Sequence, residues 1–400
     1  MEKFNTKIGL LPNQFRKENG TFDKEGALIL SGKIGGVCYD KEGFDHINEE
    51  PLNKTERRIE RTLNNGHHSV YGHISVSLNI SNIPKILAMV LNNEKEYNTS
   101  EKSARYTPVT TSVNSIISTK EIELYNKWLE IFKIKIQLHY PNSFSETKIR
   151  SLAQENARYL ITVFMPTQMV YTTSLRQLNY IASWMMEYIN KADKTNAFER
   201  KLAQAMQEFI TELDSLNLLE ERLLTNDKNR KLSLFGNNLS DTKDVFSYPY
   251  YTTYDGSFAQ LAQAQRHRTI DYQMEMIPQN GFFIPPILLD DKVLVDEWLN
   301  DMNSVANITP NGQLVTIAET GTYDNFILKC KERLCTAVQL EIANQTKNTL
   351  LRYKKALEDS CSPLAQDIEK YSHGARCTFP DYACHEQCHF SEGIKLERII

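Results

Sequence analysis

The sequence predicts a helix-rich α+β fold in which two halves repeat a similar order of elements. Three features indicate this fold: one short segment with strand-like alternation, several segments with helical spacing of apolar residues, and a polar stretch between the two sets. With 400 residues, 41% of them apolar and 24% charged, the chain can bury a core without disulfide or metal cross-links.

The elements follow in chain order. Apolar and polar residues alternate over residues 74–80, as in a half-buried strand, and Pro84 is suited to open a helix that runs to Tyr97. Over residues 174–192, apolar residues recur every three or four positions, which predicts a helix with one buried face. Two further helices are predicted over residues 258–270 and 326–351.

The polar stretch at residues 225–244 is rich in Asn, Asp, Ser and Lys, which is typical of a surface linker. No short-period repeat is present, but the similar order of elements in the two halves suggests a long-period repeat. The predicted organisation is a first repeat at 1–218, a linker at 219–244, a second and degenerate repeat at 245–358, and a Cys/His-containing C-terminal segment at 359–400.

Charge and composition exclude several classes of protein. The 46 basic residues against 50 acidic ones give a net charge of −4, which disfavours non-specific binding of nucleic acid. The sequence contains no uncharged run of about 18 residues that could span a membrane. The first residues lack the order of a signal peptide, so we expect a protein of the reducing cytoplasm, where structural disulfides are uncommon.

The strongest local signal is the run from Gln263 to Arg268, which contains Arg266, His267 and Arg268. On a helix, the two arginines would point about 200° apart, and the guanidinium groups suit phosphates and planar carboxylate or imide groups. The imidazole adds a donor or acceptor that is adjustable near neutral pH. The alternative interpretation is a solvated basic turn of helix.

A second signal lies at residues 100–106, where Ser103 precedes Arg105 by two positions and Glu101 precedes both. A small hydroxyl near an arginine can form a phosphate cradle, although a helix-capping serine beside a surface arginine is the plainer explanation. Three histidines at residues 66–73 could in principle bind metal, but no carboxylate or cysteine stands at ligand spacing beside them. Residues 333–341 carry polar groups that would also suit an ordinary amphipathic helix.

Together these segments resemble the flavin-dependent thymidylate synthases. That family has a His-rich segment, an Arg-His-Arg triplet, a Ser-x-Arg-Tyr tail, an Ala-Arg pair, and a late arginine before Ala-Gln-x-Glu-Ile. Here the His-rich segment is 66–73, the tail is 101–106, the pair is 157–158, and 37–39 is similar to the family's early Cys-Tyr. The resemblance is clear over residues 35–210 and fainter over 245–350. It implies two tandem repeats of that fold with small antiparallel sheets.

The two halves depart from the family in complementary ways. The first half has Asn92-Asn93-Glu94 where the triplet should stand, and Met185 where the late arginine should stand. The second half supplies Arg266-His267-Arg268 and Arg333, with residues 338–342 as the following motif, but it lacks the other signatures and has Ala306-Asn307 for the pair. Because no signature is lost from both halves, we expect one composite site per pair of repeats.

The resemblance implies C5 methylation of dUMP to dTMP, with carbon from methylenetetrahydrofolate and reducing equivalents from NADPH through FAD. Family sites lie between subunits of a homotetramer, so the fused chain is expected to form a homodimer that gives a pseudo-tetramer of repeats. The substrate is a small nucleotide, with no nucleic acid or membrane partner. Arg333 and Arg266 are the expected catalytic residues. The implied substrate-binding residues are Glu101, Ser103, Arg105, Arg158, Gln263 and Arg333, and the implied cofactor-binding residues are His73, Arg176, Arg266, His267 and Arg268.

Two alternatives stay within this resemblance: flavin-dependent modification of another pyrimidine nucleotide, such as hydroxymethylation, and a non-catalytic nucleotide-binding homologue. The lost triplet and Met185 in the first half favour the second alternative. Cys38 is not expected to be a nucleophile, because the flavin would carry the difficult step.

The C-terminal segment lies outside the resemblance. Cys377, Cys384 and Cys388 are close in sequence and could bind a structural zinc ion with His373, His385 or His389 as the fourth ligand. Their spacing differs from that of common zinc knuckles, and buried free thiols are the alternative. A helical metal-binding module unrelated to the family is the third class of function, and it depends on these cysteines alone.

Overall fold

The structure is a computed structural model that describes residues 3–103, 109, 116–277, 281–385, 388 and 390–400. The chain divides into two compact units that differ from the contiguous division expected from the sequence. Unit 1 comprises Met1–Lys102 and Phe164–Leu232, and unit 2 comprises Ser103–Val163 and Ser233–Ile400. The middle of the first repeat therefore packs with the second repeat, and the last of the three boundaries between the units, after Leu232, falls within the predicted linker.

Unit 1 contains a four-stranded antiparallel sheet with the strand order β1-β2-β4-β3. In β2, which contains all of the predicted strand except Ile74, Val76, Leu78 and Ile80 are buried, whereas Ser75 and Asn79 on the other face are exposed. This period of two explains why one face of the sheet packs on helices. The strands are β1 (Lys7–Leu10), β2 (Ser75–Pro84), β3 (Asn98–Glu101) and β4 (Pro166–Ser174).

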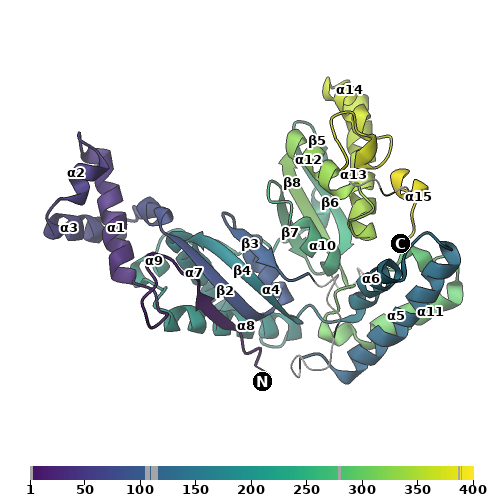
Figure 1. Ribbon diagram of the computed structural model, residues 1–400, viewed down its shortest axis with the longest axis horizontal. Coiled ribbons are helices and arrows are strands. Elements are labelled where there is room, and N and C mark those ends of the chain that lie inside the picture. Colours follow the sequence, from purple (N-terminus) through teal and green to yellow (C-terminus); the bar gives the residue numbers. More distant parts are fainter. Residues whose placement is uncertain (1–2, 104–108, 110–115, 278–280, 386–387, 389) are drawn as a thin grey trace. The chain divides into compact units, whose positions relative to one another are not determined.

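The helices of unit 1 fall into two groups. Helices α7 and α8 lie on one side of the sheet, and α4 contacts both β2 and α8 (Figure 1). Helices α1, α2 and α3 pack with one another. The bounds are α1 (Lys24–Gly36), α2 (Phe44–Asn48), α3 (Leu52–Asn64), α4 (Lys85–Leu91), α7 (Leu175–Lys191), α8 (Ala197–Ser215) and α9 (Glu221–Leu224), with short 3-10 helices η1 (Val37–Tyr39) and η2 (His68–His73).

Unit 2 repeats this topology, with the strand order β5-β6-β8-β7 in a second four-stranded antiparallel sheet. In both sheets the second strand of the order leads directly into a seven-residue helix, and the third strand leads directly into a longer one. The α+β prediction and the prediction of two tandem repeats with small antiparallel sheets are therefore confirmed. The strands are β5 (Val245–Phe246), β6 (Pro249–Ser257), β7 (Asp271–Glu275) and β8 (Leu314–Thr322), and the helices after β6 and β8 are α10 (Phe258–Ala264), α12 (Tyr323–Arg333) and α13 (Leu340–Asp359).

Each repeat has a crossover between its last two strands in sequence, and unit 2 contains both crossovers. The ring of Trp128 on α5 meets that of Trp298 on α11 edge to face, 4.8 Å between centroids, and Phe132 packs against both. The first crossover contains α5 (Thr119–His139), α6 (Glu146–Ala157) and the 3-10 helix η3 (Arg158–Leu160), and the second contains η5 (Pro286–Leu288), α11 (Lys292–Ser304) and η6 (Ala306–Ile308).

The ends of the two crossovers pair about a local two-fold axis. The Val163 N–H donates to the Thr309 carbonyl at 2.9 Å, and the Asn311 N–H donates to the Ile161 carbonyl at 2.8 Å. Val163 and Asn311 each stand three residues before the next strand of their repeat, β4 or β8. The two hydrogen bonds are therefore equivalent, as in the isologous contact of a homodimer.

Three predicted helix boundaries are wrong. The helix after Pro84 ends at Leu91, not at Tyr97, and the helix expected over 258–270 ends at Ala264. The helix expected over 326–351 is two helices, α12 and α13, separated by residues 334–339. The helix expected over 174–192 is confirmed as α7. The remaining elements are η4 (Leu239–Asp241), α14 (Leu364–Ile368), η7 (Glu369–Tyr371), η8 (Arg376–Thr378) and α15 (Ser391–Ile394).

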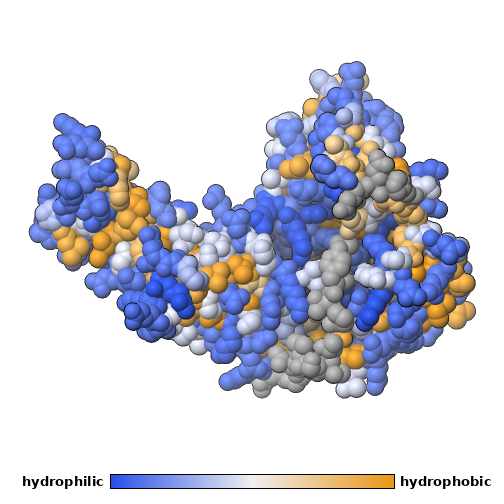
Figure 2. All heavy atoms as spheres, in the orientation of Figure 1, coloured by the Kyte–Doolittle hydropathy of each residue, from blue (hydrophilic) through white to orange (hydrophobic). Residues whose placement is uncertain are grey.

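Exposed apolar side chains gather over α5 and α11 of unit 2 (Figure 2). Ile134 and Leu138 on α5 are 57% and 71% exposed, and Leu289 and Val293 are 62% and 74% exposed. Asp290 links the two segments because it accepts from Lys135 Nζ of α5 at 2.7 Å. No helix in the described part of the chain is both long and apolar enough to cross a membrane.

Candidate functional site

Arg158 brings the first crossover into contact with the second repeat inside unit 2. Its side chain is buried, and its Nη2 donates to Gln339 Oε1 at 3.0 Å. The Gln339 N–H in turn donates to Gln263 Oε1 at 3.3 Å, just before α13 begins. Two residues predicted to bind substrate, Arg158 and Gln263, therefore meet through Gln339.

Glu341 provides a buried anion beside this contact. It accepts hydrogen bonds from the Ser257 N–H at 2.8 Å, from Ser257 Oγ at 2.6 Å and from Tyr159 OH at 2.8 Å. Burial raises the pKa of Glu341 above its ordinary value, although these hydrogen bonds and the charge of Arg158 oppose the shift. Gln339 Nε2 also donates to Tyr159 OH. The cluster is thus held rigidly by three elements, which keeps Arg158 in one orientation.

The Arg-His-Arg triplet lies in the turn that follows α10, so the helical position expected from the sequence is wrong. His267 is 2% exposed, whereas Arg266 and Arg268 are exposed. The His267 ring nitrogens lie 2.9 Å from Glu332 Oε2 and 3.2 Å from the Asn325 carbonyl. The buried imidazole therefore anchors a turn that presents two guanidinium groups at the surface.

Arg333 lies beside this anchor, at the last residue of α12. Its Nη2 is 3.5 Å from the same Glu332 Oε2, and its side chain is only 13% exposed. The hydrogen bond with His267 is the main cause that lowers the pKa of Glu332 below its ordinary value. Glu332 therefore couples the triplet to the predicted catalytic arginine. Glu332 could not be selected from the sequence, where its only distinguishing feature is its position next to Arg333.

Unit 1 holds two of the predicted cofactor-binding residues close together. A Cβ added at Gly72 would lie 3.8 Å from the guanidinium carbon of Arg176, and His73 is the next residue and is exposed. Among the described residues, Arg176 Nε is buried and has no hydrogen-bond partner. Nearby His68 is a structural residue, because its ring nitrogens contact Tyr180 OH and the Leu63 carbonyl.

The tail motif is described only in part. Glu101 ends β3, where its carboxylate accepts from Lys85 Nζ at 2.6 Å and from Asn92 Nδ2 at 3.4 Å. Ser103 follows the strand, and Arg105 lies outside the described residues. Its position relative to Arg266, and with it the composite site, stays a prediction.

The equivalence of the repeats corrects one alignment and supports another. Because α4 and α10 both contain seven residues, the triplet corresponds to residues 93–95, one position later than the sequence comparison proposed. Glu94 thus stands in the place of His267. Met185 is the eleventh residue of α7 and Arg333 the eleventh of α12, so this pair corresponds as expected.

Cys377, Cys384 and Cys388 line one cavity of about 910 Å³ in unit 2, together with Cys335 from the loop between α12 and α13. Burial and then the neighbouring thiol of Cys388 raise the pKa of Cys377. Within the described ranges, no three His, Cys, Asp or Glu side chains form a group that could hold a metal ion. His389 is outside those ranges. The zinc site therefore stays a prediction.

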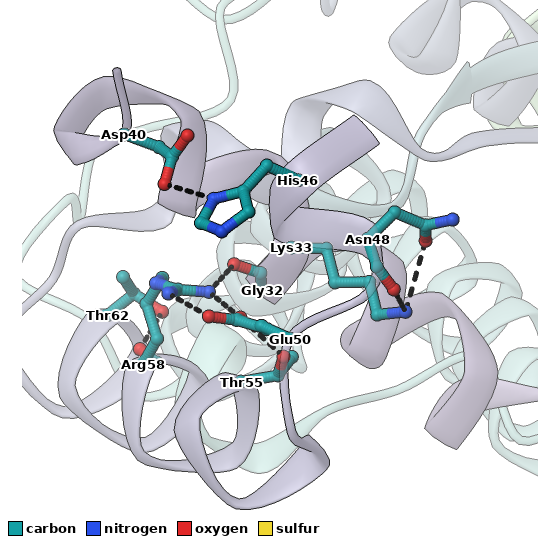
Figure 3. A network of polar contacts seen from close by, with 9 residues as sticks. All are labelled: Gly32, Lys33, Asp40, His46, Asn48, Glu50, Thr55, Arg58 and Thr62. Atoms are coloured by element: carbon teal, nitrogen blue, oxygen red, sulfur yellow. Dashed lines mark hydrogen bonds and ion pairs between the residues drawn. The ribbon is translucent and has the colours of Figure 1, made fainter. Parts of the chain in front are cut away.

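The structure contains a network of polar side chains in the region of helices α1–α3 that the sequence did not predict (Figure 3). Arg58 donates to both oxygens of Glu50, at 2.5 and 2.9 Å, and to the Gly32 carbonyl at 2.9 Å. His46 Nδ1 lies 2.8 Å from Asp40 Oδ2. A Cβ at Gly36 would lie 2.8 Å from the Arg58 guanidinium carbon, so glycine permits this close packing. The network joins the helices and contains none of the predicted site residues.

Comparisons with known proteins agree with the predicted family. The family model described as "Thymidylate synthase complementing protein" matches residues 26–213, just under half of the chain. The flavin-dependent thymidylate synthases of Pyrococcus furiosus and Thermococcus onnurineus are each 26% identical to this chain, over 150 and 148 residues. Each alignment covers 36% of this chain and 57% of the relative, so the chain spans little more than half the length of these curated relatives.

Two solved structures are also similar to this chain. One is a UMP/dUMP methylase, PolB, from Streptomyces cacaoi bound with 5-Br dUMP, with 14% identity over 55% of this chain and 93% of that chain, at a TM-score of 0.33. The other is Thymidylate Synthase X from Helicobacter pylori with FAD and dUMP, with 16% identity over 55% of this chain and 100% of that chain, at a TM-score of 0.32. Over residues 26–213, the chain is therefore similar to the flavin-dependent thymidylate synthase family.

Proposed function

We propose that this protein is a flavin-dependent methyltransferase that converts dUMP to dTMP with methylenetetrahydrofolate and NADPH. The proposal depends on one observation in unit 2: the Arg158 side chain donates to Gln339, and the Gln339 N–H donates to Gln263. Arg158 comes from the part of the chain that matches the family, and the two glutamines come from the second repeat. This contact supports a site to which both repeats contribute.

The nucleotide would be bound by groups of opposite charge and matching shape. Arg158 and Arg105, with the Ser103 hydroxyl, would bind the dianionic phosphate, because a guanidinium fork matches phosphate oxygens. The Glu101 carboxylate would accept hydrogen bonds from the ribose or the uracil edge, and the Gln263 amide could accept or donate there. Arg333 would stabilise the negative charge that the pyrimidine ring gains when it is activated, and its small exposure strengthens that interaction.

The residues present also fit FAD. Arg266 and Arg268 are exposed on a turn that buried His267 holds, which suits a pyrophosphate. Gly72 leaves space beside the guanidinium of Arg176, whose Nε has no hydrogen-bond partner among the described residues. When bound, the flavin would supply the reducing equivalents for the methyl group. The protein residues would orient the nucleotide and stabilise its charge.

We further propose a homodimer that gives four repeats in the assembly. The local two-fold pairing of the crossovers supports an association of repeats within one chain like that of two subunits. The apolar patch on α5 and α11 supports contact with a second chain, because soluble monomers rarely expose contiguous apolar surfaces of this kind (Figure 2).

Product analysis tests the function directly. The protein is incubated with dUMP, methylenetetrahydrofolate, NADPH and FAD, and the nucleotide product is analysed by mass spectrometry. A product heavier by CH2 supports methylation. A product heavier by CH2O would replace the proposal with hydroxymethylation, and no product from a folded preparation that binds dUMP would favour a non-catalytic homologue.

Variants of Arg158 test the binding role. Arg158→Ala and Arg158→Lys are both expected to weaken dUMP binding, measured by calorimetry, by roughly 10- to 100-fold, since each loses charge-assisted hydrogen bonds. Arg150→Ala is the control, because Arg150 is exposed on the neighbouring helix α6. Unchanged dUMP affinity in Arg158→Lys would contradict the proposed role.

A further inference from the structure

The first repeat has a counterpart of the His267–Glu332–Arg333 arrangement, and its residues have different chemistry. By position within the paired helices and turns, Glu94 replaces His267, and Trp184 and Met185 replace Glu332 and Arg333. Met185 is completely buried. The counterpart therefore lacks the imidazole, the acidic link and the catalytic arginine together.

Linker residues occupy the surroundings of this counterpart. Arg230 Nη2 contacts Glu94 Oε2 at 2.5 Å, and the Arg230 guanidinium carbon lies 3.7 Å from the centre of the Trp184 ring. The Glu94 side chain is wholly buried, whereas that of Arg230 is 42% exposed. Arg230 thus covers the buried carboxylate of Glu94. It also stacks on the ring of Trp184, the residue that corresponds to Glu332 of the second repeat.

The linker backbone is also held at this position. Trp184 Nε1 donates to the Lys228 carbonyl at 3.1 Å, and Ser183 Oγ donates to the Leu224 carbonyl at 2.8 Å. Leu232, which ends this part of unit 1, is 3% exposed. The segment 224–232 therefore lies along the middle of α7 and is fixed by backbone, ring and charge contacts. The sequence had suggested a solvated linker here.

The charge pattern of the counterpart is unsuited to an anion. Residues 93–95 are Asn, Glu and Lys, with no net charge, where the second repeat has two arginines around a histidine. The buried Glu94 carboxylate would repel a phosphate group, and the guanidinium of Arg230 already pairs with that carboxylate. We propose that residues 224–232 are an internal plug that closes the first repeat's counterpart of the triplet site. Building on the proposed function, each two-repeat chain then binds one FAD at an Arg-His-Arg turn, not two.

A double-mutant cycle tests the plug without any ligand. Arg230→Gln and Glu94→Gln are compared singly and together by urea denaturation of the full chain. Because the Glu94 side chain is wholly buried, Arg230→Gln leaves an unpaired buried carboxylate and is expected to lower the folding equilibrium constant by roughly 100-fold. Glu94→Gln leaves the partly exposed Arg230 in contact with solvent and is expected to cost less, with strong non-additivity in the double variant. The exposed pair Lys191–Glu187 on the same helix α7 is the control, for which no measurable coupling is expected. Additive effects at Glu94 and Arg230 would overturn the plug.

Limited proteolysis supplies a second readout. Trypsin sites at Lys228, Arg230 and Lys231 lie inside the plug, so Glu94→Gln is expected to speed cleavage there several-fold. Leu213→Ala, in the core of α8, serves as a variant that destabilises unit 1 without touching the plug. Equal cleavage in the two variants, at matched stability, would contradict a specific release of the segment.

Flavin titration separates the inference from the proposed function. One FAD per chain, lost in Arg266→Ala and retained in Arg230→Gln, supports both. Two FAD per chain would overturn the plug and leave the proposed function standing. A chain that binds no FAD, but shows the predicted coupling between Glu94 and Arg230, would contradict the proposed function and support the plug.

Discussion

Replacement of Phe132 by alanine tests the central packing feature of unit 2. Phe132 is completely buried on α5, with its ring 5.7 Å from those of both Trp128 and Trp298. A Phe→Ala change at such a site costs about 3–5 kcal/mol, because apolar contacts are lost and a cavity remains. With a urea dependence of about 1–3 kcal/mol per molar, the unfolding midpoint of this unit should fall by on the order of 1 M or more.

Tryptophan fluorescence can assign this change to a unit. The chain has three tryptophans, and in a Trp184→Phe background the remaining two, Trp128 and Trp298, both belong to unit 2. Glu123→Ala on the same helix is the control, because Glu123 is exposed and its loss should change the free energy of unfolding by less than about 0.5 kcal/mol. A Phe132→Ala loss below about 1 kcal/mol would refute the packing of the first crossover against the second.

Three further predictions concern acid stability, assembly and metal. The pKa of Glu332 is lowered, mainly by the hydrogen bond with His267, so its stabilising contribution is present at neutral pH and lost as pH falls below about 4.5. The free energy of unfolding should therefore vary less with pH in Glu332→Gln, and an unchanged loss of stability at acid pH would contradict this. Leu138→Glu should convert the expected homodimer to a monomer, measured by light scattering, and a dimer that persists would exclude the α5–α11 patch as its interface. If the C-terminal cysteines bind zinc, elemental analysis of the purified protein should find about one zinc per chain. The zinc should be lost in Cys384→Ser and kept in the control Cys361→Ser, because Cys361 is exposed. Purified protein that contains no zinc would contradict the prediction.

Elements determined by local periodicity were predictable from the sequence. The alternation over residues 74–80 lies within β2 except for its first residue, and the three- to four-residue spacing over 174–192 matches α7 almost to the residue. In both segments one face is buried against the same unit and the other is more exposed, so the pattern of side chains follows the geometry of the element directly.

Helix ends were harder to predict because tertiary contacts decide them. The break between α12 and α13 contains no proline or glycine, but Gln339 at its end is engaged by Arg158 and Gln263. Similarly, α10 stops before the triplet, where His267 is held by Glu332 and the Asn325 carbonyl. These partners are 58 or more residues away in the chain, so no local window contains the signal.

In the candidate site too, local features were predictable from the sequence and tertiary contacts were not. The residue types of the triplet and the late arginine were sufficient to select them as candidates, because guanidinium groups at those spacings resemble a known family; their roles stay a prediction. Their connection through Glu332 was not predictable, since any exposed helical glutamate has the same local appearance. The linker provides the clearest difference, because a polar composition predicted solvation whereas Arg230 is bound to a buried carboxylate.

The helix-rich α+β class with two repeats, the similarity of residues 26–213 to a known family and the complementary losses between the repeats could all be inferred from the sequence alone. Only the tertiary structure decided that residues 103–163 pack with the second repeat and that the linker covers the first repeat's own counterpart site. The physical reason is that periodicity reports which face of an element is buried, but not what buries it. The partner is chosen by shape, charge and hydrogen bonding between segments that are far apart in the chain.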